Sequence, residues 1–388
     1  MKAMILAAGK GTRVRPLTSV MPKPMIPLVR KPVMESIIEH LAQHGFDQIF
    51  INTSYLSSAI ENYFRDGERL GVQIAYSYEG HLENGQFIDR PLGSAGGMRK
   101  IQDFCGFFDS TFAVLCGDAL IDVDLGAVIE FHRSRGAVAT IVTKTVPLEE
   151  VGKYGVVVAD EDGRVKSFQE KPKAEQALST DANTGIYIFE PSVFEHIPSG
   201  QEYDIGGQLF PSLIQKGVPV YSVAQPFQWV DIGSVADFWH ATRLALGGQV
   251  RGYRLPGVEI SPGVRVGLGI RADWSKIQVS GPVYIGSGTA IGDGAVIEGP
   301  TVIGPNCVIE AGAQVRASIL GDYTRVASVA SLNENIVFAG KLIDPHGEVV
   351  DIEDADIGWL LDDARKDLID DPTHDLLREA MQRDRSAQ

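Results

Sequence analysis

The feature that most constrains the fold is a six-residue repeat in the second half of the chain. An aliphatic residue opens six successive hexads, at Val279, Ile285, Ile291, Ile297, Ile303 and Ile309. A smaller residue generally holds the fifth place of each hexad, at Val283, Thr289, Ala295, Thr301, Cys307 and Ala313. This pattern predicts a parallel β-helix, whose coils must stack because one coil alone cannot bury its apolar edge. Weaker hexads begin near Ile260 and Val266.

The part of the chain before residue 247 shows a different pattern, in which short apolar runs alternate with helical segments. The runs are rich in β-branched and aromatic residues, as buried strands are, and they span 46–53, 72–79, 111–118 and 137–144. Strands that alternate with helices predict a mostly parallel sheet covered on both sides. Ligands of such sheets lie beyond the carboxyl ends of the strands. Gly9 and Asp118 directly follow strands, so we expect them to face one crevice.

The two patterns predict two domains within 388 residues, a length that exceeds what one core usually serves. The expected parts are an α/β domain at 1–246, a linker at 247–257, the β-helix at 258–333 and a C-terminal extension at 334–388. The extension is expected to hold a hairpin and then an acidic helix. One apolar stripe of that helix would carry Ile357, Leu360, Leu361 and Ala364.

Composition excludes several classes of protein. A net charge of -15 argues against nucleic-acid binding, which requires a basic surface, and a hydrophobic content of 44% argues against disorder. Cys105, Cys116 and Cys307 are too few and too scattered for a disulfide framework or a zinc site. No segment has the roughly 18 apolar residues needed to span a bilayer, and the N-terminus is typical of a first strand rather than a signal peptide. We therefore predict a cytoplasmic protein without a membrane partner.

The loop in "LAAGKGTRVRPLTSVMPKP" (residues 6–24) has the composition of a phosphate-binding loop. Its spacing differs from that of a P-loop, and Val14 stands where a dinucleotide fingerprint needs its third glycine. A long helix cannot follow because of Pro16, Pro22, Pro24 and Pro27. What remains is a loop whose glycines let backbone N–H groups approach a triphosphate, with Arg13 and Lys23 alongside.

This segment closely resembles the opening motif of the sugar-1-phosphate nucleotidylyltransferases, which join a nucleoside triphosphate to a sugar 1-phosphate and release pyrophosphate. Further segments are similar to family motifs, in the family's order: "RPLGSAGGM", "LCGDALID", "YGVV", "FQEKP", "NTGIYIF" and "WVDIG". The resemblance covers roughly residues 1–246, and appended hexad coils are common in the family. It implies a Rossmann-like nucleotidyltransferase domain with a mixed, mostly parallel sheet, followed by a left-handed parallel β-helix.

The resemblance also implies a role for each matching residue. The nucleotide-binding positions would be Ala7, Ala8, Gly9, Gly11, Thr12, Arg13 and Gly93, and Glu79 is a further candidate from its place directly after a strand. The sugar-phosphate positions would be Gly155, Glu170, Lys171, Asn183 and Gly185. Mg²⁺ would be the cofactor, with Asp118 and Asp231 as its ligands. The catalytic set would be Arg13, Lys23, Asp118, Lys171 and Asp231.

These residue types suit the chemistry, because both reactants are anions. At about 4 Å and an effective dielectric near 20, each pair of like unit charges costs about 4 kcal/mol. Positioning and charge neutralisation should therefore dominate catalysis. We expect Arg13 and Lys23 to neutralise the triphosphate and Lys171 to hold the sugar phosphate. Mg²⁺ on Asp118 and Asp231 would bridge the α-phosphate and the attacking oxygen.

Simpler interpretations remain open for single residues. Asp118 could cap a turn, and Asp231 could cap the helix that begins near Ser234. Glu170 and Lys171 could be a solvated strand exit. Glu79 could accept the N3–H of a pyrimidine, or it could be a solvated carboxylate at a strand end.

Within the family, the segments look most like a bacterial group of UDP-glucose pyrophosphorylases that resembles mannose-1-phosphate guanylyltransferases. We therefore expect transfer from UTP to α-D-glucose 1-phosphate. The alternatives are GTP with mannose 1-phosphate, dTTP with glucose 1-phosphate, and a silent regulatory subunit that binds nucleotide sugars. An acyltransferase is disfavoured, because all eight histidines lie outside the coil segment. We expect a homo-oligomer that associates through the β-helix.

Overall fold

The computed structural model describes residues 1–9, 11–83, 86–344 and 347–366. The chain divides into two compact units. The first consists of Met1–Val14, Thr18–Ile26 and Lys31–Gly233. The second consists of Arg15–Leu17, Pro27–Arg30 and the described residues from Ser234 onward.

A nine-stranded mixed sheet forms the centre of the first unit, with its main strands in the order β12-β11-β13-β8-β1-β4-β5. Its strands are β1 (Lys2–Ala7), β4 (Gln48–Thr53), β5 (Gln73–Tyr78), β8 (Phe112–Cys116), β10 (Ala139–Thr145), β11 (Gly155–Ala159), β12 (Val165–Glu170), β13 (Asp181–Phe189) and β14 (Val220–Ala224). The neighbours β8, β1, β4 and β5 run parallel, whereas β13 joins β8 in the antiparallel direction. The carboxyl ends of the four parallel strands therefore meet at one edge, as the sequence predicts.

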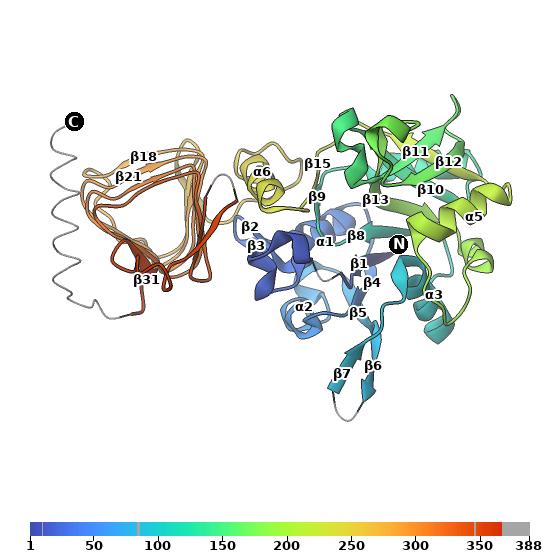
Figure 1. Ribbon diagram of the computed structural model, residues 1–388, viewed down its shortest axis with the longest axis horizontal. Helices are drawn as coiled ribbons and strands as arrows, with labels where there is room; N and C mark the ends of the chain where they lie inside the picture. The colour runs from blue at the N-terminus through green and yellow to red at the C-terminus, as the bar shows by residue number, and fades with distance from the viewer. Residues whose placement is uncertain (10, 84–85, 345–346, 367–388) are drawn as a thin grey trace. The chain divides into compact units, whose positions relative to one another are not determined.

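Helices cover both faces of this sheet (Figure 1). They are α1 (Val33–Gln43), α2 (Ser57–Phe64), α3 (Gly93–Cys105), α4 (Leu125–Ser134) and α5 (Phe210–Gln215). Alternate side chains of β1 enter different cores: Ile5 packs with α1, and Met4 packs with α3. The predicted apolar stripe of α1 is fully buried, and its residues are Met34, Ile37, Ile38 and Leu41. These contacts confirm the α/β prediction.

Several short elements complete the first unit. They are β3 (Lys31–Pro32), β6 (Gly80–Glu83), β7 (Gln86–Asp89), β9 (Ala119–Ile121) and β15 (Trp229–Asp231). The strands β6 and β7 form a hairpin that projects beside β5 and α3 (Figure 1). The strands β9 and β15 pair in the antiparallel direction. That pairing brings residues near 118 and 231 together.

In the second unit, the chain coils into a β-helix whose three sides are sheets of mainly parallel strands. Figure 1 shows this β-helix nearly end-on. One side holds β17 (Val264–Val266), β19 (Val283–Ile285), β22 (Thr301–Ile303), β25 (Ile319–Leu320) and β28 (Ile336–Phe338). The second holds β20 (Ala290–Ile291), β23 (Val308–Ile309) and β26 (Thr324–Val326). The third holds β18 (Gln278–Ser280), β21 (Val296–Glu298), β24 (Gln314–Arg316) and β27 (Ser331–Asn333).

The register of these sheets confirms the hexad prediction. Ile285 pairs with Ile303, and Ile291 pairs with Ile309, so one coil comprises three hexads. All six fifth-place residues are buried in the coil interior. The predicted handedness of the coil stays a prediction.

The coil repeat shortens by one residue near Ala317, a change that the sequence analysis did not predict. Before it, Val283 pairs with Thr301, eighteen positions on; after it, Val302 pairs with Ile319, seventeen positions on. Ala317 has a positive φ of 42°, which marks the altered corner. The coil continues in the new register.

The C-terminal end of the coil corrects one prediction. Strands β29 (Lys341–Ile343) and β30 (Val349–Asp351) extend one side in the antiparallel direction, so the predicted hairpin is present. The expected helical stripe is wrong for residues 357–364, because β31 (Leu361–Asp363) pairs with β26. The pairing covers a strand edge that would otherwise lie open. The remainder of the predicted acidic helix lies outside the described residues.

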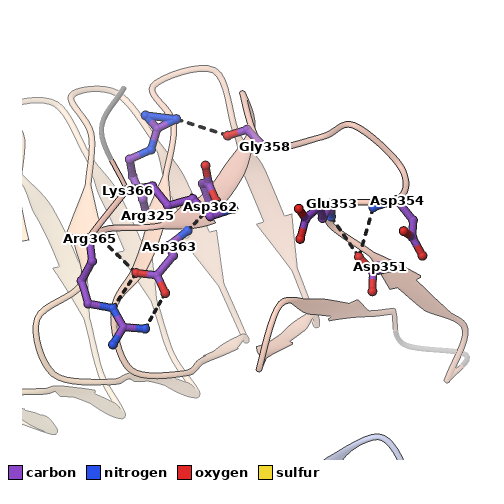
Figure 2. Close-up of polar contacts among 9 residues, drawn as sticks. All are labelled: Arg325, Asp351, Glu353, Asp354, Gly358, Asp362, Asp363, Arg365 and Lys366. Carbon is purple, nitrogen blue, oxygen red and sulfur yellow. Dashed lines mark hydrogen bonds and ion pairs between the residues drawn. The ribbon is translucent and has the colours of Figure 1, made fainter. Parts of the chain in front are cut away.

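Local polar contacts fix this end of the chain, as Figure 2 shows. Asp351 accepts hydrogen bonds from the backbone N–H groups of Glu353 and Asp354, which turns the chain after β30. The guanidinium group of Arg365 donates two hydrogen bonds to the carboxylate of Asp363, and the Arg365 backbone N–H donates a third. Such carboxylate-capped turns explain why acidic residues are frequent here without forming a helix.

Three elements at the start of the second unit are β2 (Pro27–Leu28), α6 (Val235–Leu246) and β16 (Val258–Ser261). Because α6 groups with this unit, the observed division falls before the predicted limit at 246, and the domain limits drawn from sequence stay a prediction. No helix within the described part of the chain is long and apolar enough to cross a membrane.

Candidate active site

Two aspartates that are far apart in the sequence lie side by side at the ends of short strands. Asp118 follows β8, and Asp231 is the last residue of β15. The β9–β15 register sets Asp231 opposite Ala119, and the N–H of Ile232 donates to the carbonyl of Asp118 at 3.2 Å. Backbone pairing therefore fixes the two carboxylates next to each other.

The ammonium group of Lys23 lies between these carboxylates. Its Nζ is 2.6 Å from Oδ2 of Asp118 and 3.1 Å from Oδ1 of Asp231. Lys23 opens a short 3-10 turn flanked by prolines, and it is only 8% exposed. Gly11 has a φ of +60°, and a Cβ there would come within 2.8 Å of the Lys23 Cβ. The glycine loop thus packs directly on the lysine.

Burial and charge act against each other in this cluster. Burial opposes a charge on Lys23, but Asp118 and Asp231 together raise its pKa above the ordinary value. Burial also raises the pKa of Asp118, and the Lys23 ammonium opposes that rise. With both carboxylates ionised, the three groups carry a net charge of about -1. The cluster therefore favours a further cation.

The donor set suits a hard divalent cation. Two carboxylates can hold such an ion when water and phosphate oxygens complete its shell. Among the residues that the structure describes, no group of three or more His, Cys, Asp or Glu side chains could enclose a metal by itself. An ion here would therefore depend on oxygens from a ligand.

A cavity of about 270 Å³ opens beside the cluster. Nine of the predicted site residues line it: Arg13, Lys23, Asp118, Gly155, Glu170, Lys171, Asn183, Gly185 and Asp231. They come from six separate stretches of sequence, so their convergence is a property of the fold. Residues that the sequence analysis missed also line the cavity, including Ser94, Tyr154, Asp204, Gly206 and Trp229.

The predicted sugar side of the cavity is built around a carboxylate flanked by glycines. Gly155 pairs with Glu170 across β11 and β12, and a Cβ at Gly155 or Gly206 would lie 3.1 Å from the Glu170 carboxylate. The following residue, Lys171, adopts a φ of 45° at the strand end. Glu170 and Lys171 are exposed at the cavity, so the simpler interpretation as a solvated strand exit stays open.

Asn183 and Gly185 also line the cavity. The side chain of Asn183 donates to the hydroxyl of Tyr187 at 2.8 Å and accepts from the N–H of Gly185 at 3.1 Å. Gly185 has a φ of +71°, and a Cβ there would lie 2.6 Å from Sγ of Cys116. Only glycine fits at this position.

The predicted nucleotide segments lie beside the cavity. Ala7 ends β1, and the loop through Ala8, Gly9, Gly11 and Thr12 follows it. A Cβ at Gly9 would meet no atom within 4 Å, so that side of the loop is open. Gly93 begins α3 with a φ of +71°, and a Cβ there would lie 2.6 Å from the Tyr203 carbonyl oxygen. The nucleotide contacts of these residues stay predictions.

Two of the simpler interpretations are wrong. Glu79 is only 4% exposed, so it is not a solvated carboxylate, and burial raises its pKa. Its proposed contact with a pyrimidine stays a prediction. Asp231 does not cap α6, because the Ser234 hydroxyl does so by accepting from the N–H of Asp237.

A segment to which the sequence analysis gave no site role also lines the cavity. Asp204 precedes a π-helical turn at Ile205–Leu209, and its carboxylate accepts from the Ser94 hydroxyl at 2.8 Å. The N–H of Ile205 in turn donates to Ser94 at 2.8 Å. π-helical turns occur frequently at functional sites, but no local sequence pattern predicts this one.

The fold and the polar cavity together indicate an α/β transferase that carries a β-helix. The chain belongs to the nucleotidyl transferase family, whose model matches residues 2–247. The bacterial transferase hexapeptide family (six repeats) matches residues 282–317.

Curated relatives match over most of the chain. It is 55% identical to a UTP–glucose-1-phosphate uridylyltransferase from Synechocystis sp., over 94% of each chain. It is 32% identical to a mannose-1-phosphate guanylyltransferase from Mycobacterium tuberculosis, over 84% of this chain and 80% of that one. A solved structure of UDP-glucose pyrophosphorylase with UDP-glucose has a TM-score of 0.53 at 23% identity, covering 64% of this chain and 98% of that chain. At that identity the likeness shows the fold alone.

Proposed function

We propose that this protein is a uridylyltransferase that converts UTP and α-D-glucose 1-phosphate into UDP-glucose and pyrophosphate. The observation that carries the proposal is the 55% identity to the Synechocystis uridylyltransferase over 94% of both chains. The convergence of Lys23, Asp118 and Asp231 beside a polar cavity supports it. A silent regulatory subunit is disfavoured, because it would have no need to keep this cluster.

The reaction is a direct displacement at phosphorus. An oxygen of the sugar phosphate forms a bond to the α-phosphorus of UTP, and the bond from that phosphorus to the bridging oxygen of pyrophosphate breaks. The attacking oxygen is already anionic, so no general base is needed. Cys116 lines the cavity, but burial raises the pKa of its thiol well above the ordinary value, which disfavours a thiolate nucleophile.

The residues of the chain would neutralise and orient the two anions. Arg13 and Lys23 stand on the side of the glycine loop, where the triphosphate would bind. Lys171 would hold the phosphate of the sugar, while Glu170 and Asn183 would bind its hydroxyl groups. Their fixed positions would keep the two reactants in line, which lowers the barrier by preorganisation.

Mg²⁺, which the family typically uses, would be held by Asp118 and Asp231. When bound, it would neutralise charge on the phosphate oxygens. The two carboxylates fit this role because they are adjacent and anionic.

A guanylyltransferase that uses mannose 1-phosphate is the second candidate, because the Mycobacterium tuberculosis relative matches 84% of this chain. The experiment is a pyrophosphate-release panel. Purified protein is tested with UTP, GTP, dTTP and ATP against glucose 1-phosphate and mannose 1-phosphate, with and without EDTA. We expect the highest kcat/KM with UTP and glucose 1-phosphate, and loss of turnover with EDTA. A clear preference for GTP and mannose 1-phosphate would overturn the proposal.

A further inference from the structure

Two buried polar side chains lie behind the segments proposed to face the nucleotide. Asn52 stands near the end of β4, and Glu79 directly follows β5. They are 2% and 4% exposed. Buried polar groups are costly unless they are hydrogen-bonded, so their partners indicate what they do.

Three hydrogen bonds link these side chains to both nucleotide segments. The Asn52 Oδ1 accepts from the N–H of Ala7 at 2.9 Å, at the start of the glycine loop. The Asn52 Nδ2 donates to Oε1 of Glu79 at 2.6 Å. The Glu79 Oε2 accepts from the N–H of Leu92 at 3.1 Å, immediately before Gly93. An unbroken chain therefore runs from the first glycine segment to the second.

The packing between this chain and α3 is tight. A Cβ at Gly97 on α3 would come within 2.8 Å of Oε1 of Glu79 and 3.2 Å of Nδ2 of Asn52. The helix that begins at Gly93 thus rests directly on the pair.

The hydrogen bonds also have a fixed direction. The N–H groups of Ala7 and Leu92 can only donate, so Asn52 must turn its oxygen toward Ala7, and Glu79 must accept at both of its oxygens. Between the two side chains a single donor is required, and the Asn52 amide supplies it. Any replacement that changes this pattern leaves a buried group unpaired.

We propose that Asn52 and Glu79 form a positioning pair for uridylyl transfer, which sets the spacing between the Ala7–Gly9 segment and the Leu92–Gly93 segment. The inference rests on the proposed function, and it adds a role for Asn52 that the family resemblance does not supply. The pair acts through the backbone of these segments and not by contact with the base. Its loss should weaken binding of the nucleotide while leaving the sugar side of the cavity intact.

Single and double variants test this proposal. In Asn52→Asp, the new carboxylate at position 52 lies against the carboxylate of Glu79. In Glu79→Gln, the new amide group points one N–H at the N–H of Leu92, and neither group can accept. The double variant N52D/E79Q restores the pattern, because the new amide at position 79 can donate to the new carboxylate at position 52 and still accept from Leu92. We expect each single variant to raise the KM for UTP about tenfold or more, equivalent to about 1.4 kcal/mol. The double variant should return to within about threefold of the wild type, and the KM for glucose 1-phosphate should stay within about twofold throughout.

A matched control separates positioning from general destabilisation. Thr140 is fully buried in the same unit, and its hydroxyl contacts Nδ1 of His132 at 2.8 Å. Thr140→Val should lower the melting temperature without changing the KM for UTP. Absence of rescue in the double variant, or an unchanged KM in both single variants, would overturn the proposal.

The same measurements separate a positioning role from direct recognition of the base. If Glu79 contacted the base, Glu79→Gln would change the ratio of kcat/KM values for UTP and GTP, and that outcome would also overturn the proposal. If the wild type prefers GTP, the proposed function fails, and the variants are measured with GTP. The return of the KM for GTP in the double variant then tests the positioning role independently of the proposed function.

Discussion

At the candidate active site, one ammonium group lies between two carboxylates. Lys23 offsets the repulsion between Asp118 and Asp231, and both of its contacts are short. A divalent cation would seek the same oxygens. We therefore propose that Lys23 would compete with such an ion in the ligand-free protein. Metal binding would then be favoured when a triphosphate draws the ammonium group away.

Replacing Lys23 by Gln should separate its effect on catalysis from its effect on metal binding. We expect kcat to fall by at least about a hundredfold, because one preorganised donor to the phosphates is lost. We also expect Mn²⁺ to bind the free protein more tightly, since the competing ammonium is gone, whereas Asp118→Asn should weaken that binding. Electron paramagnetic resonance of free Mn²⁺ measures affinity without turnover.

Lys166→Gln is the matched control for that experiment, because Lys166 is an exposed lysine of the same unit that pairs with Asp160. It should change neither kcat nor the affinity for Mn²⁺. Near-normal turnover in Lys23→Gln would refute the catalytic role of the lysine, and unchanged Mn²⁺ affinity would refute the competition.

At the scale of single elements, a buried histidine joins a helix to the central sheet. His132 on α4 contacts Thr140 on β10 through Nδ1 and Glu190 through Nε2. Burial lowers the pKa of His132, and this effect outweighs the opposing contact with Glu190. The folded protein therefore holds a neutral imidazole, which attaches α4 to β10 without a charge.

The lowered pKa predicts a loss of stability in acid. The unfolded chain takes up a proton near pH 6.5, whereas the folded chain resists it until a lower pH. The stability that neutral His132 contributes is thus complete above pH 6.5 and is lost as the pH falls toward the folded pKa. Urea unfolding between pH 5 and 8 should show this decline, and His132→Gln should reduce it. His240→Gln, at an exposed position on α6, should leave the decline unchanged.

In the β-helix, burial predicts which substitutions lower the stability. Ile297 is fully buried in the middle of β21, whereas Gln278 on the adjacent strand β18 is exposed. Ile297→Ala should destabilise the β-helix unit by about 2–5 kcal/mol, because it leaves a cavity in a stacked core. Gln278→Ala should change stability by less than about 0.5 kcal/mol. Chemical denaturation followed by circular dichroism measures both changes in stability, and equal losses would contradict the inward placement of Ile297.

The sequence allowed the prediction of elements whose burial repeats at a fixed period. The hexad isoleucines and the stripe of α1 are of this kind, because each pattern has one structural solution. The spacing of Ile357, Leu360 and Leu361 misled, because residues three and four apart can also bury in a turn that leads into an edge strand. Whether this segment forms a helix or such a turn depends on the open edge of β26, with which β31 pairs.

In the candidate site, too, a residue could be predicted only where a local sequence pattern indicates its position. Asp231, which ends β15 outside the central sheet, was expected only from the resemblance of its segment to a family motif. Asp118 could be predicted because it follows an apolar strand of the parallel sheet, and polar residues at such strand ends gather at one edge. Asn52 also ends such a strand, but its function depends on partners at Ala7 and Glu79 that no local pattern reveals. The link between Ser94 and Asp204 was missed for the same reason.

At the scale of the whole molecule, the first coil of the β-helix carries exposed apolar side chains. Val258 and Leu268 are 67% and 83% exposed, and Ile260 and Trp274 are also exposed. Within the described residues, β16 pairs on one side only, with β17, and so forms a sheet edge. Exposed apolar side chains beside an open edge favour self-association.

We therefore expect a homo-oligomer in solution, with a mass that is a multiple of 42.0 kDa. A charge at this surface should weaken association, because burying an unpaired ion is costly. Leu268→Lys combined with Val258→Lys should shift the sedimentation coefficient toward that of the monomer. The two substitutions should leave kcat unchanged, because the candidate site lies entirely in the first unit. Leu178→Lys, at an exposed position in the first unit, is the control and should leave assembly intact. A monomeric wild type, or an unchanged assembly in the double variant, would refute association through this edge.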